Sequence, residues 1–266
     1  MRRRTVSGAV LALLSLLALS APALAVPSKP AVVRCCAILQ WHLRNSLTGG
    51  AADITFNYGT GSTGDRPVFG DWNGDGTKTP GVRRGTYFLL RNSNTSGPAE
   101  LEIRYGILGD RPVVGDWDGD GDDTIGVVRL RDDNRLEWLL RNSNTPGPAE
   151  ISFVYSLGND LPVVGDWDGD GDDTIGAVRR QANFRFQWLL RNSNTGGAAE
   201  VSAVYGLNSD QPVVGDWDDN GDDTLGVVRR TADGRLQWLL RNSITGGAAE
   251  LSFVYGLGND FPLVWR

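Results

Sequence analysis

The stretch Gly165 to Arg179, GDWDGDGDDTIGAVR, decides the fold because near copies of it begin at Gly70, Gly115 and Gly215. The first part of each copy is rich in Asp and Gly, which favour tight loops. The second part is short, apolar and rich in β-branched residues, as is the PVVG or PVFG string that leads into each loop. Strings of this kind are typical of strands. Each copy therefore predicts two strands joined by an acidic loop.

The spacing of carboxylates within the loop predicts a metal site. Counted from Asp116 as position one, further aspartates stand at positions three and five, and Gly121 stands at position six. Alternate side chains of a tight loop can point at one centre, and a glycine permits the sharp turn that closes the loop around an ion. All candidate ligands are oxygens, so calcium is favoured over zinc or copper. An EF-hand is excluded, because Val or Ala replaces its bidentate Glu at position twelve in all four copies.

A second repeated string fixes the length of the unit. Copies or variants of WHLRNS begin at Trp41, Phe88, Trp138, Trp188 and Trp238, at spacings of 47, 50, 50 and 50 residues. Strand-built repeats of this length are typical of propeller blades rather than of helical solenoids. Continuous apolar runs such as WLL favour blades, whose two faces are both covered, over a sheet with one face in water. Each unit is therefore expected to form a four-stranded antiparallel sheet.

The ends of the chain predict a closed ring. The string VVR at 32–34 matches the second strand of the other units, and FPLVWR at 261–266 matches their first strand. Four complete units and one shared between the termini make five blades. Pairing of the N- and C-terminal strands would seal the ring and remove exposed sheet edges. The fold class expected is thus an all-β, five-bladed β-propeller, and an open stack or truncated array is the alternative.

The N-terminus predicts secretion. Three consecutive arginines precede an apolar run at 10–19, and small residues surround a cleavage point after Ala25. This pattern is typical of a secretory signal peptide and too short for a membrane span. Export by the Sec or the Tat route stays open. We expect a secreted, monomeric protein without a membrane span, divided into a signal peptide at 1–25, a short linker at 26–31 and the propeller at 32–266.

Acidic residues are concentrated in the repeated loops. The net charge of the chain is −6, and the four loops contain 17 of its 32 acidic residues. No basic stripe stands clear of these loops in the sequence, so a nucleic-acid partner is not expected.

The string DWDGDGDDTIGV, preceded by PVVG and repeated at blade spacing, resembles the FG-GAP or VCBS-type repeats of secreted bacterial proteins, the family that includes the integrin α-subunit propeller. The resemblance covers residues 32–266. It implies calcium in the hairpin between the first two strands of a blade, bound by side chains at positions one, three, five and nine and by the carbonyl at position seven. Position nine is threonine where the family has aspartate. Either this threonine or the aspartate at position eight would complete the set.

The candidate ligands follow the same order in each loop. In the last three loops they are Asp116, Asp118, Asp120, Asp122, Asp123 and Thr124; Asp166, Asp168, Asp170, Asp172, Asp173 and Thr174; and Asp216, Asp218, Asn220, Asp222, Asp223 and Thr224. In the first loop they are Asp71, Asn73 and Asp75. That loop has Thr77 and Lys78 in place of the acidic pair, and a lysine ammonium opposes a cation. We therefore expect three calcium sites and a fourth, weaker one.

Other recurring residues are given structural roles. The tryptophans at position two of the loops favour packing between blades over an aromatic platform for sugars; they are Trp72, Trp117, Trp167 and Trp217. The arginine of each LLRNS string is expected to pair with carboxylates of a neighbouring blade. The adjacent cysteines Cys35 and Cys36 are too few for a disulfide framework, and their state stays open.

The sequence favours a binding protein over an enzyme. His42 is the only histidine, and no Ser/His/Asp or Cys/His arrangement recurs with the repeat. We expect a secreted calcium-binding propeller that acts as a binding or scaffold module for an extracellular protein or glycan, with structural calcium. A lectin that reads glycans in pockets between blades is the first alternative, and a calcium-dependent hydrolase or lyase is the second.

Overall fold

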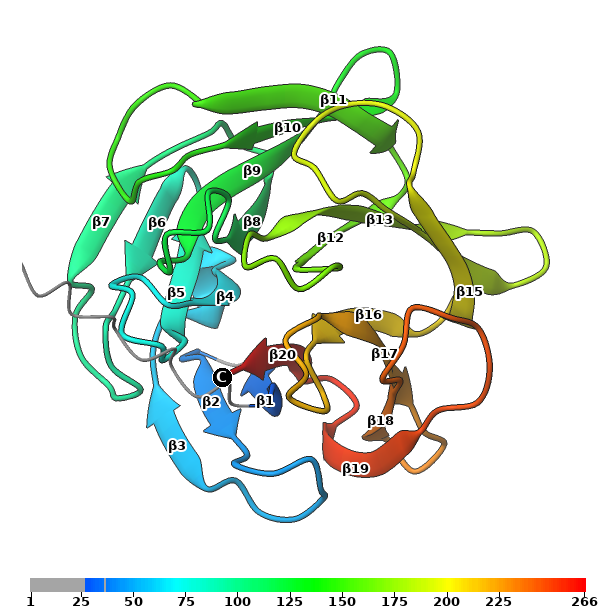
Figure 1. Ribbon diagram of the computed structural model, residues 1–266. Coiled ribbons are helices and arrows are strands. Elements are labelled where there is room, and N and C mark those ends of the chain that lie inside the picture. The colour runs from blue at the N-terminus through cyan, green and yellow to red at the C-terminus, as the bar shows by residue number, and fades with distance from the viewer. Residues whose placement is uncertain (1–26, 36) are drawn as a thin grey trace, which may run out of the picture.

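Each sequence repeat folds into one four-stranded antiparallel sheet, and five such sheets surround a central axis (Figure 1). The computed structural model describes residues 27–35 and 37–266. The expected five-bladed β-propeller is confirmed. The signal peptide expected at 1–25 lies outside the described residues.

The blades are numbered here in the order in which their innermost strands occur in the chain. Blade 1 contains β4 (Arg66–Gly70), β5 (Thr79–Arg84), β6 (Tyr87–Leu90) and β7 (Leu101–Arg104). Blade 2 contains β8 (Arg111–Gly115), β9 (Thr124–Leu130), β10 (Arg135–Leu140) and β11 (Ile151–Leu157). Blade 3 contains β12 (Leu161–Gly165), β13 (Thr174–Arg180), β14 (Arg185–Leu190) and β15 (Val201–Leu207). Blade 4 contains β16 (Gln211–Gly215), β17 (Thr224–Arg230), β18 (Arg235–Leu240) and β19 (Leu251–Leu257). Blade 5 contains β20 (Phe261–Trp265), β1 (Lys29–Arg34), β2 (Gln40–Leu43) and β3 (Ile54–Asn57), and a short 3-10 helix, Gly61–Thr63, precedes blade 1.

The two ends of the chain close the ring within blade 5. Strand β20 pairs antiparallel with β1, so that Val33 lies opposite Phe261 and Ala31 opposite Leu263. The predicted pairing of the terminal strands is therefore confirmed. Strand β1 starts at Lys29, before the domain start expected at residue 32, and the preceding Ser28 already bonds to blade 4 through its amide.

The core lies between the blades, where both faces of each sheet are covered. The aromatic residue that opens each third-strand string is 0 % exposed in all five blades. Trp138 of blade 2, for example, belongs to a cluster that also contains Ile175 and Ala177 of blade 3. Complete burial of a large aromatic side chain is among the strongest single contributions to a core. Contacts between successive blades therefore hold the ring together.

The loop tryptophans are part of this core. Trp72, Trp117, Trp167 and Trp217 are only 2–4 % exposed. Their rings pack close to the glycines of their own blades: a Cβ atom on Gly70 would lie 2.5 Å from the ring of Trp72. Each also belongs to a core cluster that contains residues of the next blade, as Trp117 does with Ile175. The predicted packing between blades is therefore confirmed, and these side chains are not available as a platform for sugars.

The recurring arginines pair within their own blade. Arg141 Nη2 lies 3.5 Å from Glu150 Oε1 and donates hydrogen bonds to Ser143 and Thr145 of the same link. The equivalent arginines of the other blades make the same kind of pair. The predicted pairing with a neighbouring blade is thus wrong, because the link between the third and fourth strands folds back over its own arginine.

Candidate metal centre

The acidic loop of blade 2 joins β8 to β9 at the end of the central channel. Its first residue, Asp116, organises the turn: Oδ1 accepts a hydrogen bond from the amide of Asp120 at 3.1 Å, and Oδ2 accepts one from the amide of Gly121 at 2.8 Å. Gly119 and Gly121 adopt φ angles of 69° and 99°, which a residue without a Cβ atom adopts at low cost. The glycines therefore let the backbone wrap around the carboxylate at position one.

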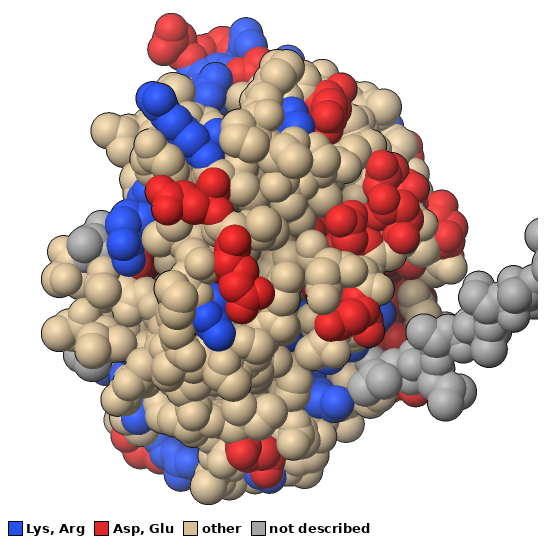
Figure 2. Space-filling view, turned by 90° about the vertical axis from the view of Figure 1, so that its left-hand side faces the viewer, with Lys and Arg blue, Asp and Glu red and all other residues tan. Residues whose placement is uncertain are grey.

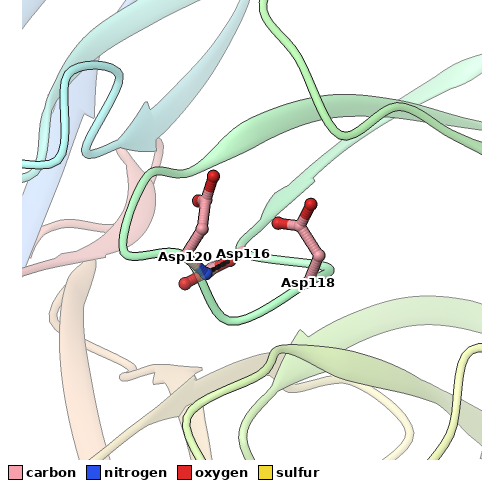
Figure 3. A group of neighbouring side chains, drawn as sticks. All are labelled: Asp116, Asp118 and Asp120. Atoms are coloured by element: carbon pink, nitrogen blue, oxygen red, sulfur yellow. Dashed lines mark hydrogen bonds between the residues drawn. The ribbon is translucent and has the colours of Figure 1, made fainter.

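This turn brings the carboxylates at positions one, three and five together. Asp116, Asp118 and Asp120 each offer one oxygen, and these oxygens lie within 4.8 Å of one another (Figure 3). Calcium binds oxygen at about 2.3–2.6 Å, so two ligands on opposite sides of one ion are about 5 Å apart. Asp118 and Asp120 are exposed and Asp116 is half-buried. The triplet could hold a metal ion that is reached from solvent.

Blade 3 has a second triplet with the same arrangement. Asp166, Asp168 and Asp170 also bring three carboxylate oxygens within 4.8 Å of one another. Asp166 accepts hydrogen bonds from the amides of Gly169, Asp170 and Gly171 at 2.7, 3.2 and 3.0 Å. The side-chain amide of Asn192 donates to Asp168 Oδ2 at 2.7 Å, which places the link between the third and fourth strands on the same face as the loop.

The loops of blades 1 and 4 fold in the same way around position one. Asp71 accepts from the amide of Gly76 at 2.6 Å, and Asp216 accepts from the amide of Gly221 at 3.1 Å. Each of these loops has an asparagine in place of one carboxylate of the triplet. In blade 1, Asn73 donates a hydrogen bond to Asp75 at 3.1 Å. These two loops therefore offer two carboxylates and one amide where blades 2 and 3 offer three carboxylates.

The electrostatics of the loops suit a cation. Burial raises the pKa of Asp116 and of Asp166 above the ordinary value. Burial raises the pKa of Asp122 and of Asp172 to about 7, and the carboxylate at position five adds to this shift through a side-chain hydrogen bond and through charge repulsion. A divalent ion at the centre of the triplet would turn this repulsion into attraction. In blade 4, Asp222 Oδ1 is buried without a hydrogen-bond partner among the described residues, and a cation would satisfy it.

The aspartate at position eight has a role that the sequence did not reveal. Asp123 Oδ2 accepts a hydrogen bond at 2.7 Å from the amide of Asp71 in the preceding blade, and the amide of Asp123 donates back to the carbonyl of Asp71 at 2.7 Å. The same reciprocal pair joins Asp173 to Asp116, at 3.0 and 2.5 Å. We call these paired bonds the interblade clasp. The position-eight carboxylates thus point to the neighbouring blade and away from their own loop.

The clasp continues around the ring with two exceptions. Asp223 bonds to Asp166, and Ser28 takes the aspartate's place in blade 5, where its hydroxyl accepts from the amide of Asp216 at 3.2 Å. Between blades 5 and 1, the only clasp bond found within the described residues runs from the amide of Lys78 to the carbonyl of Arg266, at 3.1 Å.

The threonine at position nine is also bonded within the protein. Thr124 is 1 % exposed, and its hydroxyl lies 2.6 Å from the carbonyl of Arg141 and 3.3 Å from that of Gly115, positioned to donate to either. Thr224 makes the equivalent contacts in blade 4. The structure therefore brings positions one, three and five together, and turns the side chains of positions eight and nine toward other partners.

Lys78 lies in the central channel instead of facing its own loop. Its Nζ is 3.3 Å from Asp123 Oδ2 of blade 2. Both residues line a cavity of about 480 Å³ on the propeller axis, together with Asp173, Asp223 and Arg266. The nearby carboxylates raise the pKa of Lys78 against the effect of burial. Lys78 is therefore a counter-ion for the carboxylates of the channel, and its effect on metal binding in blade 1 stays a prediction.

The single histidine and the cysteine described here lie outside the acidic loops. His42 is on β2, and burial and the positive charge of Arg34 lower its pKa. Cys35 is exposed, and Cys36 lies outside the described residues. On the side of the molecule shown in Figure 2, acidic and basic side chains are interspersed over a largely uncharged surface.

The fold and the loops define a five-bladed β-propeller with two aspartate triplets that could hold a metal ion. No protein-family model matches the chain, and no curated protein matches it either. Within residues 27–35 and 37–266, no helix has the length and apolar character needed to cross a bilayer.

Proposed function

We propose that the protein is a secreted, calcium-binding propeller of the FG-GAP or VCBS kind. In this proposal it serves as a binding or scaffold module for an extracellular protein or glycan, and it has no catalytic activity. The observation that carries the proposal is the pair of aspartate triplets, each with three carboxylate oxygens within 4.8 Å of one another. The extracellular location rests on the signal-like pattern at 1–25, and the family assignment rests on the repeated loop string.

The calcium in this proposal is structural. Extracellular sites with a Kd of about 0.1 mM, in about 1 mM calcium, would each stabilise the folded chain by roughly 1.4 kcal/mol. Three such sites would contribute about 4 kcal/mol, which is comparable to the net stability of a domain. Because the first residue of each loop also belongs to the interblade clasp, an ion that fixes the loop would also strengthen the contact between blades.

Calorimetric titration of the chain without residues 1–25 tests the proposal directly. We expect uptake of three or four equivalents of calcium, with magnesium bound more weakly because it demands a stricter geometry. Melting in calcium is expected to occur about 8–16 °C higher than in chelator, by the usual conversion for a domain of this size. Failure to take up calcium, with identical melting in calcium and in chelator, would contradict the proposal.

A pair of matched variants assigns the binding to the loops. Asp118→Ala removes a carboxylate from the triplet of blade 2, whereas Asp132→Ala removes an exposed carboxylate from the hairpin between β9 and β10. Both changes remove one surface charge. We expect only Asp118→Ala to abolish one equivalent of calcium and about 1.4 kcal/mol of calcium-dependent stability. Equal calcium uptake by both variants would place the ion elsewhere.

A further inference from the structure

Three of the crevices between neighbouring blades contain pockets of the same construction. They lie between blades 1 and 2, blades 3 and 4, and blades 4 and 5, with volumes of about 430, 280 and 210 Å³. One wall is the outer strand of the first blade. The other is formed by the inner strands of the next blade and by its link between the third and fourth strands. None of the candidate metal ligands lines these pockets, so they are separate from the acidic loops.

A buried tyrosine lines each pocket at the same position of the repeat. Tyr105, Tyr205 and Tyr255 are 6, 4 and 3 % exposed, and their hydroxyl groups have no hydrogen-bond partner among the described residues. Between blades 2 and 3, the equivalent Tyr155 donates to the carbonyl of Leu189 in the next blade at 3.0 Å. Buried polar groups without a partner are rare and cost free energy. Each of these hydroxyls is covered by protein, so it can bond a polar group of a ligand only when the tyrosine side chain turns toward the pocket.

The inner arginine of each pocket is already neutralised. Arg129, on the second strand of blade 2, donates two hydrogen bonds to Asp110, at 3.0 and 2.9 Å. The equivalent pairs in the other two pockets are Arg229 with Asp210 and Arg34 with Asp260. Such two-bond pairs hold the guanidinium in place and cancel its charge.

A second arginine at each rim is not neutralised. Arg104, Arg185 and Arg235 are exposed and line the three pockets. None of them forms an ion pair with a described residue, and no Asp or Glu lines any of the three pockets. Each pocket thus has one arginine that forms no ion pair, although Asp233 lies close enough to Arg235 for the arginine charge to lower its pKa. This charge favours an anionic ligand.

The pocket between blades 1 and 2 also has a rim arginine, although blade 1 lacks the third-strand arginine that blades 3 and 4 use. Arg185 and Arg235 begin the third strands β14 and β18. Blade 1 lacks this position, because the hairpin between β5 and β6 is shorter than in the other blades. Its pocket instead contains Arg104 from β7, at the position that blades 3 and 4 fill with Val204 and Val254. An arginine therefore lines the pocket in each case, from the third strand of blades 3 and 4 and from the fourth strand of blade 1.

We propose that each of these three pockets binds a sugar ring that bears a carboxylate, as in the uronic acid units of an acidic polysaccharide. The inference deepens the proposed binding function and rests on it, but it requires no calcium. The rim arginine pairs with the carboxylate. The tyrosine hydroxyl, which is covered without a ligand, turns toward the pocket and bonds to a ring hydroxyl. The exposed side chains of Ile107 and Leu257 offer apolar contact to the C–H face of the ring in two pockets.

The size and number of the pockets favour a carbohydrate chain over a protein partner. Volumes of 210–430 Å³ lie on either side of the lower limit of about 300 Å³ for small-molecule sites, and they suit one ring at a time. Three such pockets around one molecule allow a polymer to engage more than one of them. Linked binding of this kind can raise the apparent affinity by about 10²-fold or more.

The test is a titration of the folded chain with glucuronate, with glucose as the neutral control, followed by calorimetry and by amide chemical shifts. We expect three glucuronate molecules per chain, weak binding in the millimolar range as for other single-ring contacts, and little response to glucose. A uronic acid polymer is expected to bind at least about tenfold more tightly than the monomer. No response to glucuronate up to about 10 mM, or an equal response to glucose, overturns the proposal.

Matched variants locate the binding. Tyr205→Phe removes the unpartnered hydroxyl of a tyrosine that lines a pocket, whereas Tyr155→Phe removes one that is already bonded within the protein. We expect the first change to weaken binding in one pocket about two- to tenfold and the second to leave glucuronate binding unchanged. Arg185→Gln, at an exposed position, is expected to weaken binding in that pocket by at least about tenfold. If both Tyr205→Phe and Arg185→Gln bind glucuronate as tightly as the unchanged protein does, the pocket between blades 3 and 4 is not the binding site.

The same titration, repeated in chelator below the melting temperature, separates this inference from the calcium proposal. If the protein binds glucuronate but takes up no calcium, the sugar-binding proposal is supported and the calcium proposal is refuted. Calcium uptake without glucuronate binding would overturn the pockets alone.

Discussion

Blade 5 has no acidic loop and therefore no loop tryptophan. Replacing Trp265 by glycine tests whether Trp265 fills the space that the loop tryptophan occupies in other blades. In the other blades a glycine ends the first strand, and in blades 1 and 4 the loop tryptophan packs over it; a Cβ atom on Gly215 would lie 2.9 Å from the ring of Trp217. Trp265 pairs with Lys29 at the sheet position where Gly165 pairs with Thr174. Its own side chain belongs to the core cluster of blade 5. Restoring the repeated glycine is therefore expected to destabilise the protein.

The size of the effect follows from burial and one hydrogen bond. The Trp265 side chain is 6 % exposed, and its Nε1 donates to the carbonyl of Arg44 at 3.0 Å. Removing a buried tryptophan side chain costs about 3–5 kcal/mol, and loss of the hydrogen bond adds about 1 kcal/mol. We expect a decrease of about 4–6 kcal/mol in the free energy of unfolding, which lowers the melting temperature by about 8–24 °C in a domain of this size.

Thermal and urea unfolding in calcium, followed by circular dichroism, measure this effect. Trp265→Phe keeps an aromatic ring but loses the Nε1 donor, so it is expected to cost roughly half as much. A Trp265→Gly chain that melts within about 2 °C of the natural sequence would refute the reasoning, because the ring would then contribute nothing to blade 5.

Further variants test the channel, the clasp and the single histidine. Lys78→Met removes the cation beside Asp123, and because the lysine side chain is 33 % exposed we expect a screened loss of about 1–2 kcal/mol in urea unfolding. Asp173→Ala breaks the clasp to blade 2 and is expected to cost about 1–3 kcal/mol, whereas Asp173→Asn retains an acceptor and is expected to cost less. The pKa of His42 is lowered by burial, so the stability it contributes is full above about pH 6.5 and is lost as the pH falls through its folded value. His42→Leu is therefore expected to flatten the loss of melting temperature between about pH 7 and pH 5.

Periodicity made the fold predictable. Strings of apolar residues at a constant spacing predicted four strands per unit, and the match of 261–266 to a first strand predicted closure. These features depend on local patterns, which a single sequence contains. The carboxylates at positions one, three and five were also predictable as a group, because one tight loop with glycines at fixed places brings them together.

Polar contacts between blades were not predictable in this way. Asp122 and Asp123 are adjacent in sequence, yet the carboxylate of Asp123 bonds to the preceding blade. The direction of each side chain depends on the distance and angle between neighbouring blades around the axis, which the spacing of repeats does not contain. Lys78 was misplaced for the same reason, since its partner Asp123 belongs to the next blade. Trp265 stood in the sequence as a departure from the repeat, and only the packing of blade 5 explains it.

The interblade clasp has one weak junction, and we expect the ring to open there first. At four junctions the side chain at position eight accepts a bond from the preceding blade. A lysine ammonium has no acceptor atom, so Lys78 cannot return the bond that its amide gives to Arg266. We therefore expect unfolding to begin at the boundary between blades 5 and 1. Blade 1 would separate from the paired chain termini before the other blades separate from one another. Amide protons along β4 and β20 are expected to exchange with solvent sooner than those of the equivalent strands β12 and β16.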